Sequence, residues 1–532
     1  MGKLWFGGTI YTLEKEGAMV EAIYTEGNRI MKTGEIAEIE EIFNERICER
    51  VDLMGGTMFP GFVDSHLHLI GHGETLVQLD LSELNSKDEV LAVVQEYAKQ
   101  LNKEEWIIGE GWNENRWPRT EMIHRKELDE ISPDNPVMLK RICRHAMIVN
   151  TKALELAGVT EETVSPPGGV MEKDVEGRLT GLIKDKAQDF ILAAIPVVSE
   201  DYLQEAMRAA IKDLYQLGIT GVHTEDLNYY AGFDRTFRTF KKVIEEEGLK
   251  LRAHLLVHHE VVEDMAHAGA SFLSGSEWIE FGAMKIFADG ALGGRTALLS
   301  RPYHDAPEAN GVAIFSQKEL NELVAKARKH NLPVAVHAIG DLAFEYVLNA
   351  IEEHPLVGPG RDRLIHAQIL RQDLIERAKR LPVILDIQPV FLASDFPWVI
   401  DRVGSDRMEY CYAWKTLINE GLICAGGSDA PIELPNPMFG IHAAVTRTNR
   451  KDSKRIVYGE EQALSVYEAI NLFTKGSAYA ACHEVDRGMI KEGFLADFTV
   501  LDEDIFNLHP SRISTVNAVM TVIGGDIVYT KE

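Results

Sequence analysis

Residues 60–68 read Pro-Gly-Phe-Val-Asp-Ser-His-Leu-His, and the interpretation of the whole chain starts from this stretch. Its apolar start suits a short buried strand that ends in two histidines separated by one residue. Because alternate side chains of a strand face the same way, His66 and His68 are predicted to project side by side. Together they can hold one metal ion. Taken alone, the pair could equally be two unrelated histidines, each hydrogen-bonded in the protein core.

Beyond about residue 200, helical and strand-like patterns alternate along the chain. Candidate strands lie at 219–224, 252–257, 282–287, 334–337, 364–368, 383–387 and 422–426, and residues 61–68 make the eighth. Helices are predicted between them at 201–217, 233–247, 317–330, 342–354, 371–379 and 407–419. Eight such units predict an α/β fold, a (β/α)8 TIM-type barrel over residues 59–75 and 205–479, with its active site at the carboxyl ends of the strands.

Both ends of the chain have a different texture, with short strand-like runs separated by turns. This pattern predicts a small β-sandwich domain built from residues 1–58 together with residues 480–532. Residues 76–204 have an irregular rhythm, broken by Pro-Pro-Gly-Gly at 166–169. We interpret them as an α/β insertion that follows the first barrel strand and lies near the barrel mouth.

The overall composition limits the kinds of partner. Fifty-five Lys and Arg stand against 83 Asp and Glu, a formal charge of -28. Such a surface repels phosphate backbones and anionic lipids, so a small-molecule substrate is expected rather than nucleic acid or a membrane. Five cysteines without a Cys-x-x-Cys motif and a start without a signal peptide favour a cytoplasmic protein. A homo-oligomer is the common arrangement for soluble enzymes, and the state stays open here.

Polar residues fall at the ends of other predicted barrel strands. Lys285 lies on the fourth strand, His337 ends the fifth, His366 lies on the sixth, and Asp429 follows the eighth. Imidazole and carboxylate ligands together suit zinc or a similar first-row ion. Four histidines and a carboxylate exceed what one catalytic ion needs, which indicates two ions; one or two ions per chain are therefore expected.

These motifs resemble those of the metal-dependent amidohydrolase superfamily, in its branch of YtcJ-like and N-substituted formamide deformylase-like proteins. The resemblance covers essentially the whole chain. It is carried by residues 60–68, Lys-Ile-Phe-Ala-Asp-Gly-Ala-Leu-Gly-Gly-Arg-Thr-Ala at 285–297, Val-His-Ala-Ile-Gly-Asp at 336–341, Ile-His-Ala-Gln at 365–368 and Gly-Ser-Asp-Ala-Pro at 427–431. The five motifs together are specific, although none is specific alone.

The resemblance implies a binuclear site. One ion takes His66, His68 and Asp429, the other takes His337 and His366, and a carboxylated Lys285 bridges them with a hydroxide. Carboxylation turns a cation that two metal ions would repel into an anionic oxygen ligand. The alternative for Lys285 is an unmodified lysine paired with a carboxylate, which a one-metal site would favour.

The resemblance also implies a reaction. The metal-bound hydroxide attacks a carbonyl and cleaves a C–N bond, other than a peptide bond, in an amide, formamide or cyclic amide. Asp429 takes the hydroxide proton and passes it to the leaving nitrogen; a carboxylate that only binds metal is the alternative. A hydrolase or isomerase of another substrate class, and a catalytically silent binding or regulatory homologue, stay open.

Four further residues are candidate substrate contacts. Arg295 either holds an anionic substrate group or clamps its loop to Asp289 or Asp305, and Asp289 lies on the same loop. Trp112 and His145 belong to the insertion and are predicted to reach over the barrel mouth. For Trp112, packing in a core is the alternative.

Overall fold

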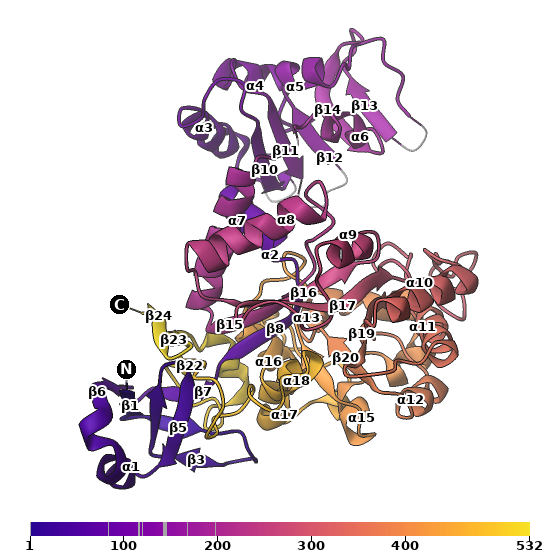
Figure 1. The fold of residues 1–532 in the computed structure, drawn as a ribbon. Coiled ribbons are helices and arrows are strands. Elements are labelled where there is room, and N and C mark those ends of the chain that lie inside the picture. The colour runs from indigo at the N-terminus through magenta and orange to yellow at the C-terminus, as the bar shows by residue number, and fades with distance from the viewer. Residues whose placement is uncertain are drawn as a thin grey trace. The chain divides into compact units, whose positions relative to one another are not determined.

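The computed structural model describes residues 2–82, 84–114, 117–119, 121–141, 146–166, 169–196 and 198–531. They form two compact units, residues 1–72 with 207–532 and residues 73–206 (Figure 1). The boundaries between the units fall within two helices, α2 (Leu69–Val77) and α7 (Glu200–Gln216). Among the residues described, none of the helices has the length and apolar character needed to cross a bilayer.

Eight parallel strands form one sheet in the larger unit, in the order β21-β20-β19-β18-β17-β16-β15-β8. The strands are β8 (Phe62–Leu67), β15 (Ile219–Thr224), β16 (Arg252–His258), β17 (Ile279–Phe287), β18 (Val334–Ala338), β19 (Asp362–His366), β20 (Val383–Ile387) and β21 (Cys424–Gly426). Nearly all of their residues are buried, as expected of parallel strands that carry helices on one face and a filled barrel interior on the other. The predicted (β/α)8 barrel is confirmed.

Most helices of the larger unit lie outside the strands, whereas α13 (Phe391–Asp395) lies near their carboxyl ends, where Phe391 stacks on His366 (Figure 1). The helices of this unit also include α8 (Phe233–Phe240), α9 (Val262–His267), α10 (Gln317–Lys329), α11 (Asp341–Glu353), α12 (Gln372–Ala378), α14 (Trp398–Val403), α15 (Trp414–Asn419), α16 (Pro437–Thr446), α17 (Val466–Leu472) and α18 (Lys475–Ala480). Helix α10 shows why they form. Ser316 and Glu319 make a reciprocal cap at its start, and Leu320, Val324 and Ala327 give it one buried face.

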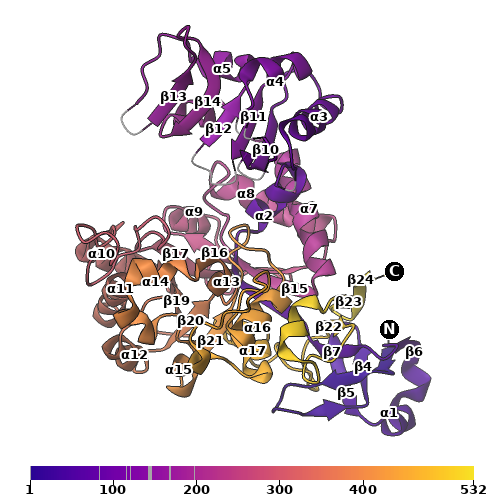
Figure 2. The ribbon, with the colours of Figure 1, turned by 180° about the vertical axis from the view of Figure 1, so that it is seen from behind.

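Both termini build a β domain in this same unit, and Figure 2 shows their strands side by side. One sheet has the order β5-β4-β1-β6 and the other β24-β23-β22-β7-β2-β3. The strands are β1 (Gly2–Phe6), β2 (Thr9–Tyr11), β3 (Met19–Val20), β4 (Ala22–Glu26), β5 (Arg29–Gly34), β6 (Ile47–Asp52), β7 (Thr57–Pro60), β22 (Phe498–Leu501), β23 (Ala518–Ile523) and β24 (Asp526–Thr530). Trp5 and Ile23 of the first sheet share a core with Met58 and Phe498 of the second. Helix α1 (Ile36–Phe43) covers the other face of the first sheet.

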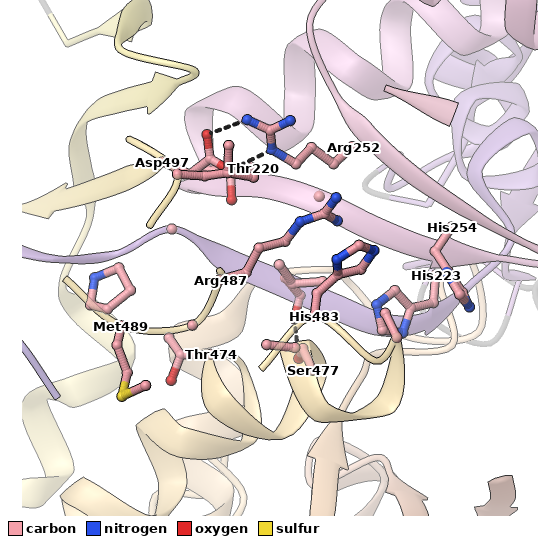
Figure 3. A pocket seen from close by; sticks show the side chains of 18 residues that line it. Thr220, His223, Arg252, His254, Thr474, Ser477, His483, Arg487, Met489 and Asp497 are labelled. Carbon is pink, nitrogen blue, oxygen red and sulfur yellow. Dashed lines mark hydrogen bonds and ion pairs between the residues drawn. The ribbon is translucent and has the colours of Figure 1, made fainter. Parts of the chain in front are cut away.

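Polar contacts fix the β domain to the amino-terminal end of the barrel. Arg252, which begins β16, donates two hydrogen bonds to the carboxylate of Asp497, at 2.5 and 2.9 Å (Figure 3). Thr499 of β22 accepts a hydrogen bond from the backbone of Phe62 and donates one to the carbonyl of Gly218. Because these groups are buried, each needs its partner, and the contacts define how the two parts meet.

The smaller unit is a mixed sheet with helices on both faces. Its strand order is β13-β14-β12-β11-β10-β9, and its strands are β9 (Leu79–Asp80), β10 (Ile107–Trp112), β11 (Val137–Arg141), β12 (Ala146–Val149), β13 (Gly169–Lys173) and β14 (Leu179–Asp185). Alternate residues of β11 enter separate cores: Val137 and Leu139 pack with α3 (Lys87–Ala98) and α4 (Arg125–Ile131), whereas Met138 packs with α5 (Thr151–Leu156) and α6 (Gln188–Leu192).

The first and last barrel strands, β8 and β21, are joined by hydrogen bonds at their carboxyl ends, which we call the barrel seam. The carboxylate of Asp64 accepts bonds from the backbone of His66 at 3.1 Å, the backbone of Ser428 at 3.1 Å and the Ser428 hydroxyl at 2.6 Å. The Asp429 backbone donates to His66 O at 2.7 Å. A Cβ on Gly427 would lie 2.7 Å from His66 N, so only glycine permits this approach.

Replacing Asp64 with alanine is expected to lower the free energy of unfolding by about 3 kcal/mol, because three buried donors lose their acceptor. Urea denaturation measures this change. Asp52→Ala is the matched control, since that carboxylate is exposed and accepts a single bond, from the backbone of Met54. Equal stability of the two variants would show that the seam does not depend on Asp64.

Candidate metal centre

Three side chains from distant parts of the chain converge beside the seam. His66 lies on β8, His366 ends β19, and Asp429 follows β21 by three residues. One ligand atom from each lies within 4.8 Å of the other two, and all three residues are buried. The backbones of His366 and Asp429 have φ of 77° and 59°, a conformation that non-glycine residues adopt only where the surrounding structure imposes it. Two imidazoles and a carboxylate fit the ligand set of a catalytic zinc ion.

His68 stands next to this cluster. Its Nε2 is 3.5 Å from Asp429 Oδ1, and its Nδ1 is 2.7 Å from the carbonyl oxygen of Glu225. Donation from Nδ1 to that carbonyl fixes the ring and leaves Nε2 turned toward the cluster. Although burial opposes it, the hydrogen bond and charge of Asp429 raise the pKa of His68 to about 9. Metal binding at His68 therefore requires the release of a proton.

His337 lies on the far side of His366, with the two ring centroids 4.4 Å apart. Its Nε2 is 3.2 Å from the carbonyl oxygen of Gly290 and 3.5 Å from Asp289 Oδ1. His366 is oriented by Gln388, whose Oε1 is 2.7 Å from His366 Nδ1. This contact leaves His366 Nε2 available as a ligand.

Lys285 of β17 lies beneath these histidines and is fully buried. Its Nζ is 3.1 Å from His66 Nε2 and 4.6 Å from the ring centroid of Phe287. Burial lowers the pKa of Lys285, and the more distant carboxylates of Glu225 and Asp429 oppose that shift. No ion pair holds its amine among the described residues, so the structure does not show the paired lysine that the sequence left as an alternative.

The electrostatics of the site keep three of the histidines ready for a metal ion. Burial first, and then neighbouring positive charges, holds the pKa values of His66 and His337 well below the usual range. Burial also lowers the pKa of His366 to about 4. Around Asp429, burial is outweighed by His68 and the other cations, which lower the pKa of that carboxyl. Neutral imidazole and ionised carboxylate are the forms that bind metals.

Three of the four candidate substrate residues lie in the described part of the chain, and each has contacts with other parts of the protein. Arg295 forms two hydrogen bonds with Asp305, at 2.8 and 3.0 Å. Asp289 is buried and accepts bonds from the backbones of Leu298, Ile339 and Gly340, so it shapes the loops after β17 and β18. Trp112 is buried in the core of the smaller unit, where its Nε1 donates to Leu139 O. His145 lies outside the described residues.

Glu225 was missed by the sequence interpretation. It follows β15 and is fully buried, and its Oε2 accepts a hydrogen bond from the Tyr229 hydroxyl at 2.8 Å. Its Oε1 has no partner in the described part of the chain. Its position one residue beyond a predicted barrel strand was the signal that could have identified it.

Aromatic side chains surround the polar cluster. Tyr229 lies 5.8 Å from the ring of His68, Phe287 lies 5.4 Å from that of His337, and Phe391 stacks on His366 at 5.9 Å. These rings give the polar cluster partly apolar surroundings, which strengthen electrostatic interactions at its polar atoms.

Comparisons with known proteins show which family the sequence matches. The sequence matches the Amidohydrolase family over residues 49–529. It is 52% identical over 531 residues to "Putative amidohydrolase YtcJ" of Bacillus subtilis strain 168, with 100% of each chain covered. It is 24% identical to N-substituted formamide deformylase of Arthrobacter pascens, covering 98% of this chain and 97% of that protein.

A solved structure shares both fold and sequence. The crystal structure of an uncharacterized metal-dependent hydrolase from Pyrococcus horikoshii OT3 matches with a TM-score of 0.81 and 30% identity. The match covers 96% of this chain and 99% of that one. This structural match agrees with the family match over most of the sequence. The chain belongs to the amidohydrolase family.

Proposed function

We propose that this amidohydrolase cleaves the C–N bond of a small amide, formamide or cyclic amide. The observation that carries the proposal is the convergence of His66, His366 and Asp429, with ligand atoms within 4.8 Å, at the carboxyl ends of the barrel strands. This is the end of the barrel where enzymes of this fold do their chemistry. The similarity to N-substituted formamide deformylase makes N-substituted formamides the first substrates to test.

The chain offers ligands for two divalent ions, for which zinc is our proposal. His66, His68 and Asp429 would hold one ion, and His337 and His366 the other, with a carboxylated Lys285 between them. A bound divalent ion supplies two effects here: it lowers the pKa of water toward about 7, and it polarises a carbonyl group. Carboxylation joins the neutral Lys285 amine to carbon dioxide with loss of one proton, and the buried, unpaired Nζ is suited to that step.

The remaining steps belong to residues of this chain. Asp429 accepts at its carboxylate a proton from the water that attacks the carbonyl carbon, and then donates that proton to the nitrogen that leaves as the C–N bond breaks. Tyr229 and Phe391 provide apolar walls for the group attached to the nitrogen. Hydrolysis of esters or isomerisation on the same site are the competing reactions, and a screen with formamides, hydantoins, N-acyl amino acids and esters separates them.

Asp429→Asn is expected to reduce turnover of the best substrate by about 10³-fold or more while leaving the fold intact, because the amide cannot carry the proton. Steady-state kinetics and circular dichroism measure the two effects. Zinc content, measured by mass spectrometry, separates a lost ligand from a lost proton carrier. Asp406→Asn, at an exposed carboxylate, is the control. Turnover at the wild-type rate in Asp429→Asn would refute the role of Asp429.

Carboxylation of Lys285 predicts an additional carbon-13 resonance after the metal-loaded protein is equilibrated with labelled bicarbonate. The resonance should be absent from Lys285→Met, whose metal content should also fall, because a bridging ligand is lost. Lys318→Met, at an exposed lysine, should keep both the resonance and the metal. An unmodified amine in fully metallated wild-type protein would rule out the bridge.

A further inference from the structure

A cavity lies at the end of the barrel opposite the candidate metal centre, beside the amino-terminal end of β21. Its volume is about 410 Å³, within the range of sites for small molecules. We call it the rear pocket. Its floor is largely apolar and consists of Leu422, Ile423, Cys424, Leu472, Tyr479 and Met489. Ile423 is 39% exposed although it is a large aliphatic residue, so this apolar surface is open to a ligand.

The acidic residues at the rim of the rear pocket are already neutralised. Glu468 forms an ion pair with Lys415, and Glu484 forms one with Arg361. Neither Lys415 nor Arg361 lines the pocket, so both carboxylates are held from outside it. The rim therefore does not offer free negative charge to a cation.

The two basic residues at the rim, Arg487 and Lys475, differ in whether a carboxylate lies close to them. Arg487 is 3.8 Å from Glu280. It also lines a separate pocket, drawn in Figure 3, where it lies next to His483. Lys475 forms no ion pair with any described residue; its Nζ donates to the Tyr467 hydroxyl at 2.8 Å. An ammonium group with three donors keeps the capacity to bind an anion in addition.

An amide side chain is also among the residues that line the rear pocket. Asn471 lines the rear pocket, and its buried Oδ1 has no hydrogen-bond partner among the described residues. Buried polar atoms are seldom left without a partner, but this oxygen is closed off from solvent, so it is not counted among the groups that a ligand in the pocket would contact. The apolar floor and the ammonium group of Lys475, which has no ion-pair partner among the described residues, thus define two complementary parts of one ligand.

We propose that the rear pocket binds a small amphipathic anion, with its apolar body on the floor and its carboxylate or sulfonate at Lys475. This site is independent of the metal centre and of the proposed hydrolysis. A ligand there lies against β21, the strand that leads to Asp429.

Two dyes of nearly equal shape test the proposal on the full-length protein. 8-Anilinonaphthalene-1-sulfonate carries a sulfonate, and N-phenyl-1-naphthylamine has the same apolar body and N–H group without it. Fluorescence titration should show one sulfonate dye per chain, bound about ten-fold or more tighter than the neutral dye. Equal affinities would overturn the assignment of an anion site.

Variants locate the binding. Lys475→Glu should abolish the preference for the sulfonate dye while keeping affinity for the neutral one, and Ile423→Trp, which fills the cavity, should weaken both by about ten-fold or more. Lys318→Glu makes the same charge change at an exposed lysine of α10 and should bind both dyes like the wild type. Unchanged binding of the sulfonate dye to Lys475→Glu would refute the proposal. Crystals soaked with that dye decide the case where Ile423→Trp does not fold: density in the rear pocket supports the site, and density only elsewhere overturns it.

Discussion

The carboxylate of Asp64 holds together two strands that are 364 residues apart in the sequence, and the rest of the site depends on this contact. It fixes the backbone of His66 on one side and Ser428 on the other. Asp429 follows Ser428 directly in the chain, and its backbone N–H donates to His66 O. The same contacts therefore set the distance between the candidate metal ligands His66 and Asp429. Burial raises the pKa of Asp64 to about 7, so the protein bears the cost of a buried acid to keep the seam closed.

Deep burial also determines the chemistry of the site. The barrel interior contains Lys285, Glu225 and the ion pair between Arg363 and Asp386, all with almost no exposure. Charged groups in such surroundings need partners. Arg363 is paired with Asp386 and also donates to the carbonyl of Ser65, although Arg363 Nη1 and Asp386 Oδ1 have no hydrogen-bond partner among the described residues. Lys285 contacts His66 Nε2 but has no carboxylate in an ion pair with it among the described residues, and Glu225 Oε1 has no hydrogen-bond partner there. These two residues lie beside His66 and His68, which the proposal assigns as metal ligands.

The sequence was sufficient to predict the barrel and the polar residues at the carboxyl ends of its strands, because both follow from local patterns. Strands are short apolar runs, and a histidine or aspartate at the end of such a run is visible without the fold. The predicted helix over 407–419 was wrong: a 3-10 helix (Ser405–Tyr410) and α15 are separated, and Tyr412 between them has φ of 50°. Tyr412 is held there by Gln368 and Asp395, contacts between distant residues that a local pattern does not contain.

Side-chain partners were harder to predict for the same reason. The sequence left open whether Arg295 clamps its loop or holds a substrate, and only the fold brings Asp305 within reach. The contacts of Asp289 with three backbone groups depend on two loops that meet after folding. Glu225 and Gln388 orient histidines from neighbouring strands, so they emerge only when the strand order is known.

Strand β7 pairs with β22, and the bond between Phe62 and Thr499 at this junction spans 437 residues. During synthesis on the ribosome, the amino-terminal strands emerge long before their partners exist. At translation speeds of about 5–20 residues per second, that interval is roughly 20–90 s. Throughout it, apolar strand edges remain without their native neighbours and are open to aggregation or chaperone capture. Any truncation that removes the last 40 or so residues would extend this vulnerable state indefinitely, since the nascent chain could not complete its first domain.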